Sequence, residues 1–444
     1  MSKGTCDILN LEWSSKPSRD RIASTLVANY LRYQGLSVIE GNIFKGYQLI
    51  REKSPKILFI NGAVGARINH HLVKFAVSKG VKVVSFSAEG NYTEDHPKGI
   101  DPFFWGWNLD KLLYEDFTLV WSRRVKNLIL NKHPELDSRI LISGGIGFDN
   151  YKIEPAIKKD FLLQKYKKAS YEKIIGVGCW NFGGFYPESP FFEAKQKRFS
   201  EEQIKRFLSD ASNFNRILRE VIEENPDILF LIKEHPGRSE GHRGSGVQGL
   251  DSFENVLIFH REESIKSCLE ASDFWLFYES TTSLESWLMN KMTFKLNPSG
   301  EDFIRNNIHK GSPLIETKEQ LAELIGKFYN HEEIEIFEKL EDERILLIEN
   351  IIGNNDGLNH VRAGNVILNL YENIDQVNSY AFKYNKQKLD ELKIRLSYML
   401  NKKVNDFDKN EMLNYALKQY QLQKDFYQEM NLDNEKLKQI VSYN

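Results

Sequence analysis

The sequence predicts an α/β protein with two doubly wound, parallel-sheet domains and a helical segment at its C-terminal end. Short apolar runs typical of buried strands alternate with amphipathic helical stretches, and this alternation restarts once after a lysine-rich interval. The last 80 residues, which follow Gly364, contain neither glycine nor proline. Strands that alternate with helices imply crossover connections, and therefore parallel sheets with helices on both faces.

Length and composition restrict the class of protein. A chain of 444 residues with 41% hydrophobic and 27% charged residues is long enough for two or three folded domains and is not typical of a disordered chain. Its formal net charge of −2 argues against a nucleic-acid partner. No apolar run approaches the roughly 20 residues that span a bilayer, and Cys6, Cys179 and Cys268 fit neither a disulfide framework nor a zinc site. We therefore expect a cytoplasmic protein.

Residues 1–150 are expected to form the N-terminal domain. Amphipathic helices are predicted at residues 19–33, 69–78 and 123–130, because apolar side chains recur there on one helical face. The predicted strands are short apolar runs at residues 6–11, 37–39, 57–60, 81–86, 117–120 and 139–142.

Residues 151–172 are predicted to be a linker with a crossing helix, and residues 173–375 to be the second domain. Its predicted strands lie at residues 173–177, 228–232, 256–259, 274–277 and 293–296. Its predicted helices lie at residues 201–224, 262–270 and 281–289.

Residues 376–444 are predicted to form a helical tail. Leu389, Leu392, Leu396 and Leu400 recur at a spacing that places them on one face of a helix. The tail has 12 basic and 9 acidic residues, a net charge of +3. It could pack on the rest of the chain, pair with a second copy, or contact the surface of a membrane.

A polar cluster follows directly after the predicted strand 228–232. Lys233, Glu234 and His235 stand where the carboxyl end of a buried parallel strand presents groups to a ligand. Pro236 disfavours helix for the residue before it, so His235 is expected in an extended conformation. An imidazole in this place can donate a hydrogen bond to a phosphate oxygen and stabilise a leaving group. A strand-end turn without a ligand is the alternative.

Four consecutive hydroxyl residues, Ser280 to Ser283, open the predicted helix 281–289 just after a strand that ends near Glu279. Hydroxyls at a helix start meet unpaired backbone N–H groups, which is an anion-binding arrangement. Glu285 follows about one turn later, at a distance suited to a ribose hydroxyl. Capping of the helix is the alternative for both features.

A glycine-rich stretch from Gly176 to Gly184 follows the predicted strand 173–177. Glycines allow close approach of a backbone to a ligand, and Gly178 and Asn181 are the candidates here. The spacing differs from the dinucleotide-binding fingerprint and lacks the lysine of the phosphate-binding P-loop. The stretch is consistent with the first loop of a nucleotide-binding domain.

Two strand-end loops carry the candidate residues of the N-terminal domain. One begins with Asn61 and ends at Arg67, and the other contains Glu89 beside Gly90. A carboxylate at the carboxyl edge of a sheet is suitably placed to be a general base or nucleophile. An ordinary loop glutamate is the alternative.

The stretch from Asp95 to Asn108 holds aromatic residues, of which Trp105 and Trp107 could stack on a sugar ring or pack in the core. Its acidic and histidine side chains, with those nearby, follow no known metal-ligand spacing, so no metal site is predicted. These side chains are Asp95, His96, Asp101 and Asp110.

Taken together, the motifs resemble those of a known class of enzymes. The chain combines Lys233-Glu234-His235-Pro236 with a hydroxyl-rich helix start that ends in Ser283-Leu284-Glu285. It resembles the GT-B glycosyltransferases of bacterial surface-carbohydrate synthesis over roughly residues 5–375. Within them it is similar to the branch of CMP-sugar enzymes, the sialyltransferases and Kdo transferases, and more distantly to the CDP-glycerol glycerophosphotransferases.

The resemblance implies two Rossmann-like domains that face a cleft, and transfer of a sugar from a CMP-linked donor to a glycan or glycolipid acceptor. The best match is a donor carrying an ulosonic acid, and the nucleotide-sugar is a substrate, with no cofactor and no metal. The implied catalytic residues are Glu89, followed by Gly90, and His235, which would contact the donor phosphate. The residues assigned to donor binding are Lys233, Gly178, Asn181, Glu279, Ser280, Thr281, Thr282, Ser283 and Glu285, and those assigned to acceptor binding are Asn61, Arg67, Trp105 and Trp107.

Three other functions remain open at this point: a nucleotide-sugar epimerase, a CDP-polyol phosphotransferase, and a non-catalytic protein of glycan assembly. The sequence is compatible with both an inverting and a retaining mechanism. The protein is expected in the cytoplasm, either free or on the surface of the inner membrane.

Overall fold

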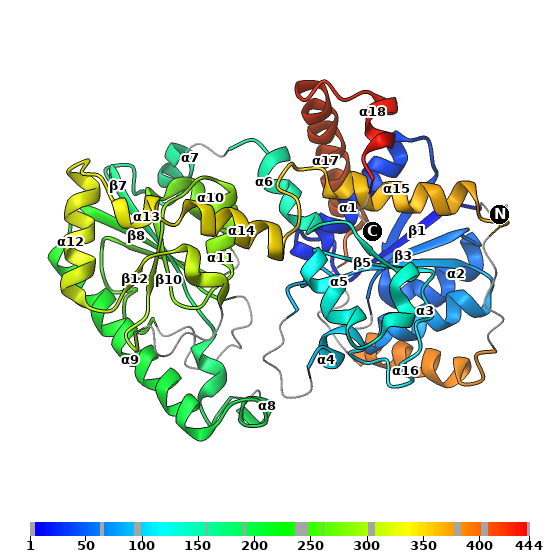
Figure 1. Ribbon diagram of the computed structural model, residues 1–444, viewed down its shortest axis with the longest axis horizontal. Helices are drawn as coiled ribbons and strands as arrows, with labels where there is room; N and C mark the ends of the chain where they lie inside the picture. Colours follow the sequence, from blue (N-terminus) through cyan, green and yellow to red (C-terminus); the bar gives the residue numbers. More distant parts are fainter. Residues whose placement is uncertain are drawn as a thin grey trace. The chain divides into compact units, whose positions relative to one another are not determined.

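The computed structural model describes residues 5–62, 66–92, 99–156, 159–189, 192–235, 247–260, 262–300, 307–376, 383–400 and 407–441. The expectations that involve residues 63–65, 95–97 and 236–237 lie outside these ranges. The chain divides into two compact units (Figure 1). Unit 1 comprises Met1–Glu154 and Glu349–Asn444, and unit 2 comprises Pro155–Ile348.

Unit 1 contains a six-stranded parallel sheet in the order β2-β1-β3-β4-β5-β6. The order reverses between β1 and β3, which are hydrogen-bonded neighbours although β2 separates them in the sequence. The strands are β1 (Ile8–Glu12), β2 (Val38–Asn42), β3 (Ile57–Asn61), β4 (Lys82–Phe86), β5 (Phe117–Val120) and β6 (Ile140–Ile142).

Helices cover both faces of this sheet (Figure 1). They are α1 (Arg19–Tyr33), α2 (Gly46–Lys53), α3 (Arg67–Ser78), α4 (Asp101–Phe104), α5 (Arg123–Leu130), α6 (Asn150–Ile153), α15 (Asn359–Glu372), α16 (Gln387–Leu400), α17 (Lys409–Glu429) and α18 (Asn434–Gln439). Successive strand residues point to opposite faces. Accordingly, Ile57 and Phe59 of β3 pack with α1, α15 and α17, whereas Leu58 and Ile60 pack with α2, α3 and α16.

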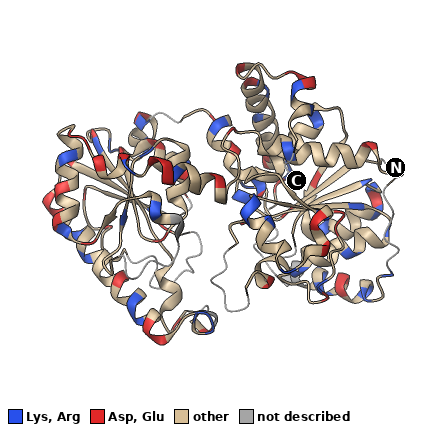
Figure 2. Cartoon of the chain, in the orientation of Figure 1, with Lys and Arg blue, Asp and Glu red and all other residues tan. Residues whose placement is uncertain are grey.

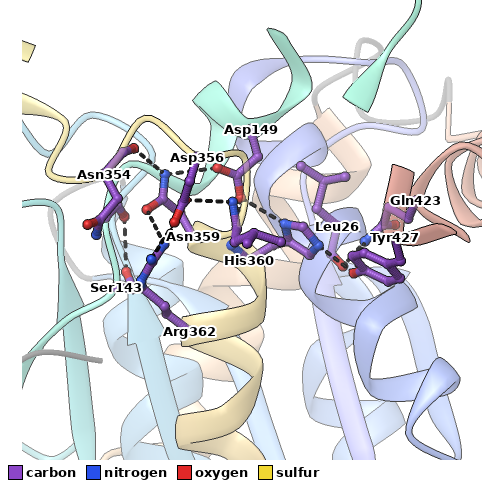
Figure 3. A network of polar contacts seen from close by, with 12 residues as sticks. Leu26, Ser143, Asp149, Asn354, Asp356, Asn359, His360, Arg362, Gln423 and Tyr427 are labelled. Atoms are coloured by element: carbon purple, nitrogen blue, oxygen red, sulfur yellow. Dashed lines mark hydrogen bonds and ion pairs between the residues drawn. The ribbon is translucent and has the colours of Figure 1, made fainter. Parts of the chain in front are cut away.

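A buried polar network holds the tail helix α17 against this body (Figure 3). Nδ1 of His360, on α15, lies 2.8 Å from Oδ2 of Asp149, and Nε2 of His360 lies 2.6 Å from the hydroxyl of Tyr427, on α17. The backbone N–H of His360 also donates to Asp149 (2.7 Å). The tail is therefore an integral layer of unit 1.

Unit 2 contains a second six-stranded parallel sheet, in the order β12-β11-β10-β7-β8-β9. The strands are β7 (Lys173–Gly178), β8 (Ile228–Lys233), β9 (Val256–Phe259), β10 (Phe274–Phe277), β11 (Thr293–Leu296) and β12 (Leu314–Ile315). The helices are α7 (Lys159–Lys165), α8 (Phe192–Gln196), α9 (Glu201–Glu224), α10 (Ile265–Ala271), α11 (Thr282–Leu288), α12 (Lys318–Tyr329) and α13 (Glu335–Glu338), and the chain passes into unit 1 within α14 (Glu341–Ile351).

The longest helix of unit 2 illustrates how the sequence specifies its elements. The hydroxyl of Ser200 accepts from the N–H of Gln203 while the side chain of Gln203 accepts from the N–H of Ser200, and this capping box starts α9. Apolar residues such as Phe207, Phe214 and Leu218 recur along one face of α9 and are buried against the sheet.

The predicted fold class is confirmed, and the outline of the predicted strands agrees with the two sheets. The boundary of the second domain differs from the structure. We expected residues up to 375 in the second domain, whereas Glu349 onward belongs to unit 1. The reason is that α15 buries Val361 and Ile367 in the same core as α1.

Candidate functional site

The carboxyl edge of the unit 2 sheet brings together the segments that the sequence singled out. Here β7 has β8 on one side and β10 on the other, and it is the first strand of the unit, so the chain order reverses between β7 and β10. Open α/β sheets bind ligands beyond the carboxyl ends of their strands at such a point. Gly178 lies opposite Lys233 of β8 and opposite Phe277 of β10, so the three following segments leave the sheet at one edge.

His235 leaves this edge just after β8 and is partly buried. The backbone N–H of Cys179 donates to the carbonyl of Lys233 (3.0 Å), which fixes the end of β8 beside the loop after β7. Because neighbouring strands lie about 4.8 Å apart, the segments after β8 and β10 leave the sheet about 10 Å apart, on either side of β7. Side chains from the two segments are long enough to reach one phosphate group placed between them.

The four hydroxyls before and within α11 divide into two pairs. Ser280 is partly buried and Thr281 is exposed. By contrast, Oγ1 of Thr282 accepts from Nε1 of Trp275 (3.0 Å), and Ser283 is fully buried with its hydroxyl 3.4 Å from Nδ1 of His309. Thr282 and Ser283 therefore hold the turn in place, and the hydroxyl of Ser280 contributes by accepting from the backbone N–H of Thr282 (3.3 Å). Of the four predicted donor-binding hydroxyls, those of Ser280 and Thr281 stay candidates.

A buried pair beneath this turn was not predicted from the sequence. Nε2 of His309 lies 3.6 Å from Oε2 of Glu279, and both side chains are fully buried. With Nδ1 facing Ser283, His309 connects Glu279 to the first turn of α11. His309 belongs to no motif and lies 30 residues after Glu279, so no local pattern points to it.

Several other predicted donor-binding residues have a structural explanation. The ammonium of Lys233 donates to the carbonyl of His260 (2.6 Å), which ties β8 to the end of β9. A Cβ on Gly178 would lie 2.6 Å from Oγ1 of Thr282 and 2.8 Å from Nε1 of Trp275, so this glycine makes room for side chains of its own sheet. Glu285 is buried in the first turns of α11, and Asn181 is partly buried at the start of a short 3-10 helix.

In unit 1 the corresponding edge gathers carboxyl groups. Asn61 ends β3, beside β1, and Asp20 lies in the first turn of α1, the helix that follows β1. The side chain of Asn61 lies close enough to Asp20 to lower the pKa of its carboxyl group. Burial, and then the charge of Glu89, raise the pKa of Asp20 above its usual value of 3.8, against the lowering effects of Asn61 and Arg19.

Asp20 was therefore missed by the sequence analysis. An acidic residue in the first turn of a helix is normally a favourable charge for the helix end, and Ser18 caps α1 through its hydroxyl. Only the reversal of strand order between β1 and β3 brings Asp20, Asn61 and Glu89 together, and this order is not visible in the sequence.

Glu89 lies exposed on a rigid turn after β4. The indole of Trp121 covers the turn: its Nε1 donates to the carbonyl of Ser87 (2.7 Å), and a Cβ on Gly90 would lie 2.5 Å from the ring. Gly90 is therefore required by this close approach, and it fixes the backbone that presents Glu89.

The two predicted acceptor-binding tryptophans differ in burial. Trp105 is only 5% exposed, packs in the core beside α5, and donates through Nε1 to His133 (3.2 Å). Trp107 is 47% exposed, and the guanidinium of Arg67 lies 5.2 Å from its ring centroid. Trp105 is therefore a core residue. Trp107, with Arg67 beside it, is accessible, as a residue that binds an acceptor must be.

The charges of both units are mixed in sign, with Lys and Arg interspersed among Asp and Glu on the helices (Figure 2). In the described part of the chain, no three His, Cys, Asp or Glu side chains are grouped so as to hold a metal ion. Within the same ranges, no helix is long and apolar enough to cross a bilayer.

Two units, each with a six-stranded parallel sheet covered by helices, define a GT-B-like fold. Comparison with known proteins agrees at the level of the fold. A structure described as a UDP-N-acetylglucosamine 2-epimerase of Listeria monocytogenes matches with a TM-score of 0.52 and 11% identity, over 86% of this chain and 100% of that chain.

Two further solved structures show the same likeness. MnaA of S. aureus, solved with UDP, matches with a TM-score of 0.51 and 14% identity, over 85% of this chain and 100% of that chain. The wall teichoic acid polymerase TagF matches with a TM-score of 0.52 and 11% identity, over 84% of this chain and 91% of that chain. No family model and no curated protein matches the sequence.

Proposed function

We propose that this protein is a glycosyltransferase that moves an ulosonic acid from a CMP-linked donor to a surface glycan or glycolipid. The observation that carries the proposal is that the segments bearing His235 and bearing Ser280 and Thr281 leave the carboxyl edge of unit 2 on either side of β7, where the strand order reverses. Ligands of open α/β sheets occupy this position. The identity of the donor rests on the resemblance of these motifs to those of the CMP-sugar enzymes.

In this proposal unit 2 binds the donor phosphate. His235 donates a hydrogen bond to a phosphate oxygen, and Ser280 and Thr281 add their hydroxyls and backbone N–H groups. The buried contact of His309 with Glu279 and Ser283 keeps the hydroxyl-bearing turn in a fixed conformation. These groups stabilise the negative charge that collects on the phosphate as it leaves.

Unit 1 supplies the base. The acceptor hydroxyl attacks the anomeric carbon, the bond between that carbon and the phosphate oxygen breaks, and Glu89 takes the hydroxyl proton. The nucleotide leaves with the electron pair on its phosphate oxygen. Asp20 and Asn61 act as positioning residues for Glu89, since Asp20 lies close enough for the charge of Glu89 to raise its pKa. Arg67 and Trp107 are proposed to contact the acceptor.

Replacement of His235 by alanine tests this assignment. We expect the release of CMP from a CMP-linked ulosonic acid, with a glycan acceptor present, to slow by about 100-fold or more, the effect typical of losing a donor that stabilises a leaving group. His331→Ala is the matched control, because His331 is an exposed histidine of the same unit in the turn after α12. A correctly folded His235→Ala protein with a near-normal rate would refute the assigned site.

A nucleotide-sugar 2-epimerase is the second candidate, because structures described as such epimerases share the fold over their full length. An epimerase converts its nucleotide-sugar without an acceptor. Incubation of the protein with UDP-N-acetylglucosamine alone separates the two functions. Epimerisation in the absence of acceptor would favour this second candidate, and acceptor-dependent release of the nucleotide would favour the transferase.

A further inference from the structure

The tail helix α16 carries an apolar stripe on its outward face. Leu389, Leu392 and Leu396 are 52%, 54% and 49% exposed. They follow one another at i, i+3 and i+7, so they form one ridge about 10 Å long on the helix. The opposite face of α16 packs on unit 1 through Ile394, which is buried in the core beside α3.

The charges of α16 are sorted between the same two faces. Its acidic residues point inward: Oδ2 of Asp390 accepts from the hydroxyl of Tyr384 (2.6 Å), and Glu391 forms an ion pair with Arg51. Both carboxylates are buried. The basic residues Lys386, Lys388 and Lys393 are exposed, and so is Arg395, whose guanidinium forms an ion pair with Glu391 (2.9 Å). The outward face therefore combines leucines with positive charge and carries no acid of this helix.

A neighbouring loop adds exposed apolar side chains next to α16. Leu109 and Leu112, which follow α4, are 81% and 51% exposed. Between them, Asp110 accepts from Lys74 of α3 (2.6 Å), and the ammonium of Lys74 lies 5.4 Å from the ring centroid of Tyr384. The loop and the start of α16 thus flank the same part of α3.

We propose that the outward face of α16, with the adjoining loop 109–112, docks on the surface of an anionic lipid bilayer. A leucine ridge flanked on both sides by Lys and Arg is the pattern of a helix that lies in the membrane interface, with its apolar side chains among the acyl chains and its cations at the headgroups. A bilayer adapts to a single convex ridge, whereas a protein partner would need a matching groove. This inference does not depend on the proposed transferase activity.

The charge of the patch also favours a lipid bilayer over a second copy of the chain as its partner. In a symmetric dimer through α16, the same patch meets itself, so Lys388 and Lys393 of one copy would approach the basic residues of the other. The acids of this helix are turned inward and already bound, Asp390 to Tyr384 and Glu391 to Arg51 and Arg395, so they leave the lysines unneutralised. An anionic surface would supply the negative charge that complements the lysines of this patch.

Sedimentation with sucrose-loaded vesicles tests the proposal. The full-length protein should bind vesicles of phosphatidylcholine with about one-third phosphatidylglycerol, and bind vesicles of phosphatidylcholine alone weakly. The variant Leu392→Ser/Leu396→Ser should lower the partition coefficient on the anionic vesicles by about tenfold or more. Because both leucines are half exposed, we expect the fold to persist, which circular dichroism checks.

The matched control is Leu413→Ser/Leu417→Ser on α17, whose leucines are equally exposed at 55% and 58%. It should leave vesicle binding unchanged. The proposal is overturned if the wild-type protein ignores anionic vesicles, if the α16 variant binds as the wild type does, or if both double variants lose binding equally. A wild-type dimer that the α16 variant converts to monomer, measured by sedimentation velocity, would identify the patch as an interface between copies and overturn it as well.

Discussion

At the scale of single residues, two carboxyl groups near the edge of the unit 1 sheet have raised pKa values, which favour their protonated forms. Glu12, the last residue of β1, is 3% exposed, and burial raises its pKa to about 8 against the lowering effects of Ser24 and Arg21. Asp20 is shifted in the same direction by burial and by the charge of Glu89. We expect Asp20 to affect the pH dependence of catalysis, because it lies beside the proposed base, and Glu12 to affect the pH dependence of stability.

Replacing Asp20 by asparagine should change the pH dependence of catalysis. Wild-type kcat/KM should contain an ionisation above the usual aspartate value of 3.8, because Asp20 keeps its proton longer beside Glu89. The Asp20→Asn protein should lose that ionisation, and its kcat should fall by about tenfold. Asp227→Asn, at an exposed acid of unit 2, is the control. Superimposable pH profiles of wild type and Asp20→Asn would show that Asp20 is not coupled to the reaction.

Replacing Glu12 by glutamine should flatten the dependence of stability on pH. Between the ordinary value of 4.5 and the raised value of about 8, the unfolded chain releases the Glu12 proton while the folded protein keeps it. The folded state therefore binds more protons than the unfolded state, and stability falls as pH rises through this interval. A neutral glutamine removes this loss of stability, which amounts to about 5 kcal/mol at most.

Urea unfolding at pH 5 and at pH 8 measures this effect. The wild-type protein should lose more free energy of unfolding between the two pH values than Glu12→Gln does. An equal loss in both proteins would mean that Glu12 is ionised in the folded state, in contradiction to its burial beside the core.

At the scale of elements, the buried network of α15 and α17 explains why the tail belongs to unit 1 (Figure 3). The hydroxyl of Tyr427 faces Nε2 of His360 and also accepts from Nε2 of Gln423 (3.4 Å). Beside this network, α17 follows α1, where the side chain of Gln423 donates to the carbonyl of Leu26 (2.9 Å). This contact between Gln423 and Leu26 joins residues that are 397 positions apart in the sequence.

The Tyr427→Phe variant tests the network. It leaves the aromatic ring in place but removes the hydroxyl, so a buried nitrogen of His360 and the amide of Gln423 lose a partner. We expect the free energy of unfolding of unit 1 to fall by about 1–3 kcal/mol. Tyr420→Phe, on the same helix and only partly buried, should change it by less than about 0.5 kcal/mol. Equal stability of the two variants would show that the network does not hold α17.

At the scale of the whole molecule, the fold class was predictable because each strand is a short apolar run and each long helix has an apolar face. The order of the strands was not predictable from the sequence. This order brings Asp20 to Asn61 and places Gly178 between Lys233 and Phe277. Local patterns identify where a strand ends, but they do not show which strands become neighbours.

The tail shows the same limit. Its helical nature followed from its composition, yet Leu389, Leu392 and Leu396 point outward, and the helix packs through Ile394 and its acids instead. Similarly, the sequence favoured four ligand-facing hydroxyls, whereas contacts with Trp275 and His309 occupy two of them. Residues 349–375 continue the pattern of the second domain in the sequence, but their apolar face complements α1 of the first.

The most direct test of the central claim, that unit 2 binds a nucleotide phosphate beside His235, is a thermal-shift measurement with CMP, CDP, UDP and GDP on the wild-type protein and on His235→Ala. A ligand that binds only the folded state raises the melting temperature. We predict that a cytidine nucleotide raises the melting temperature of the wild-type protein by several degrees, and that His235→Ala loses most of this shift. A protein that none of the four nucleotides stabilises, or a His235→Ala variant that keeps the full shift, would contradict the claim.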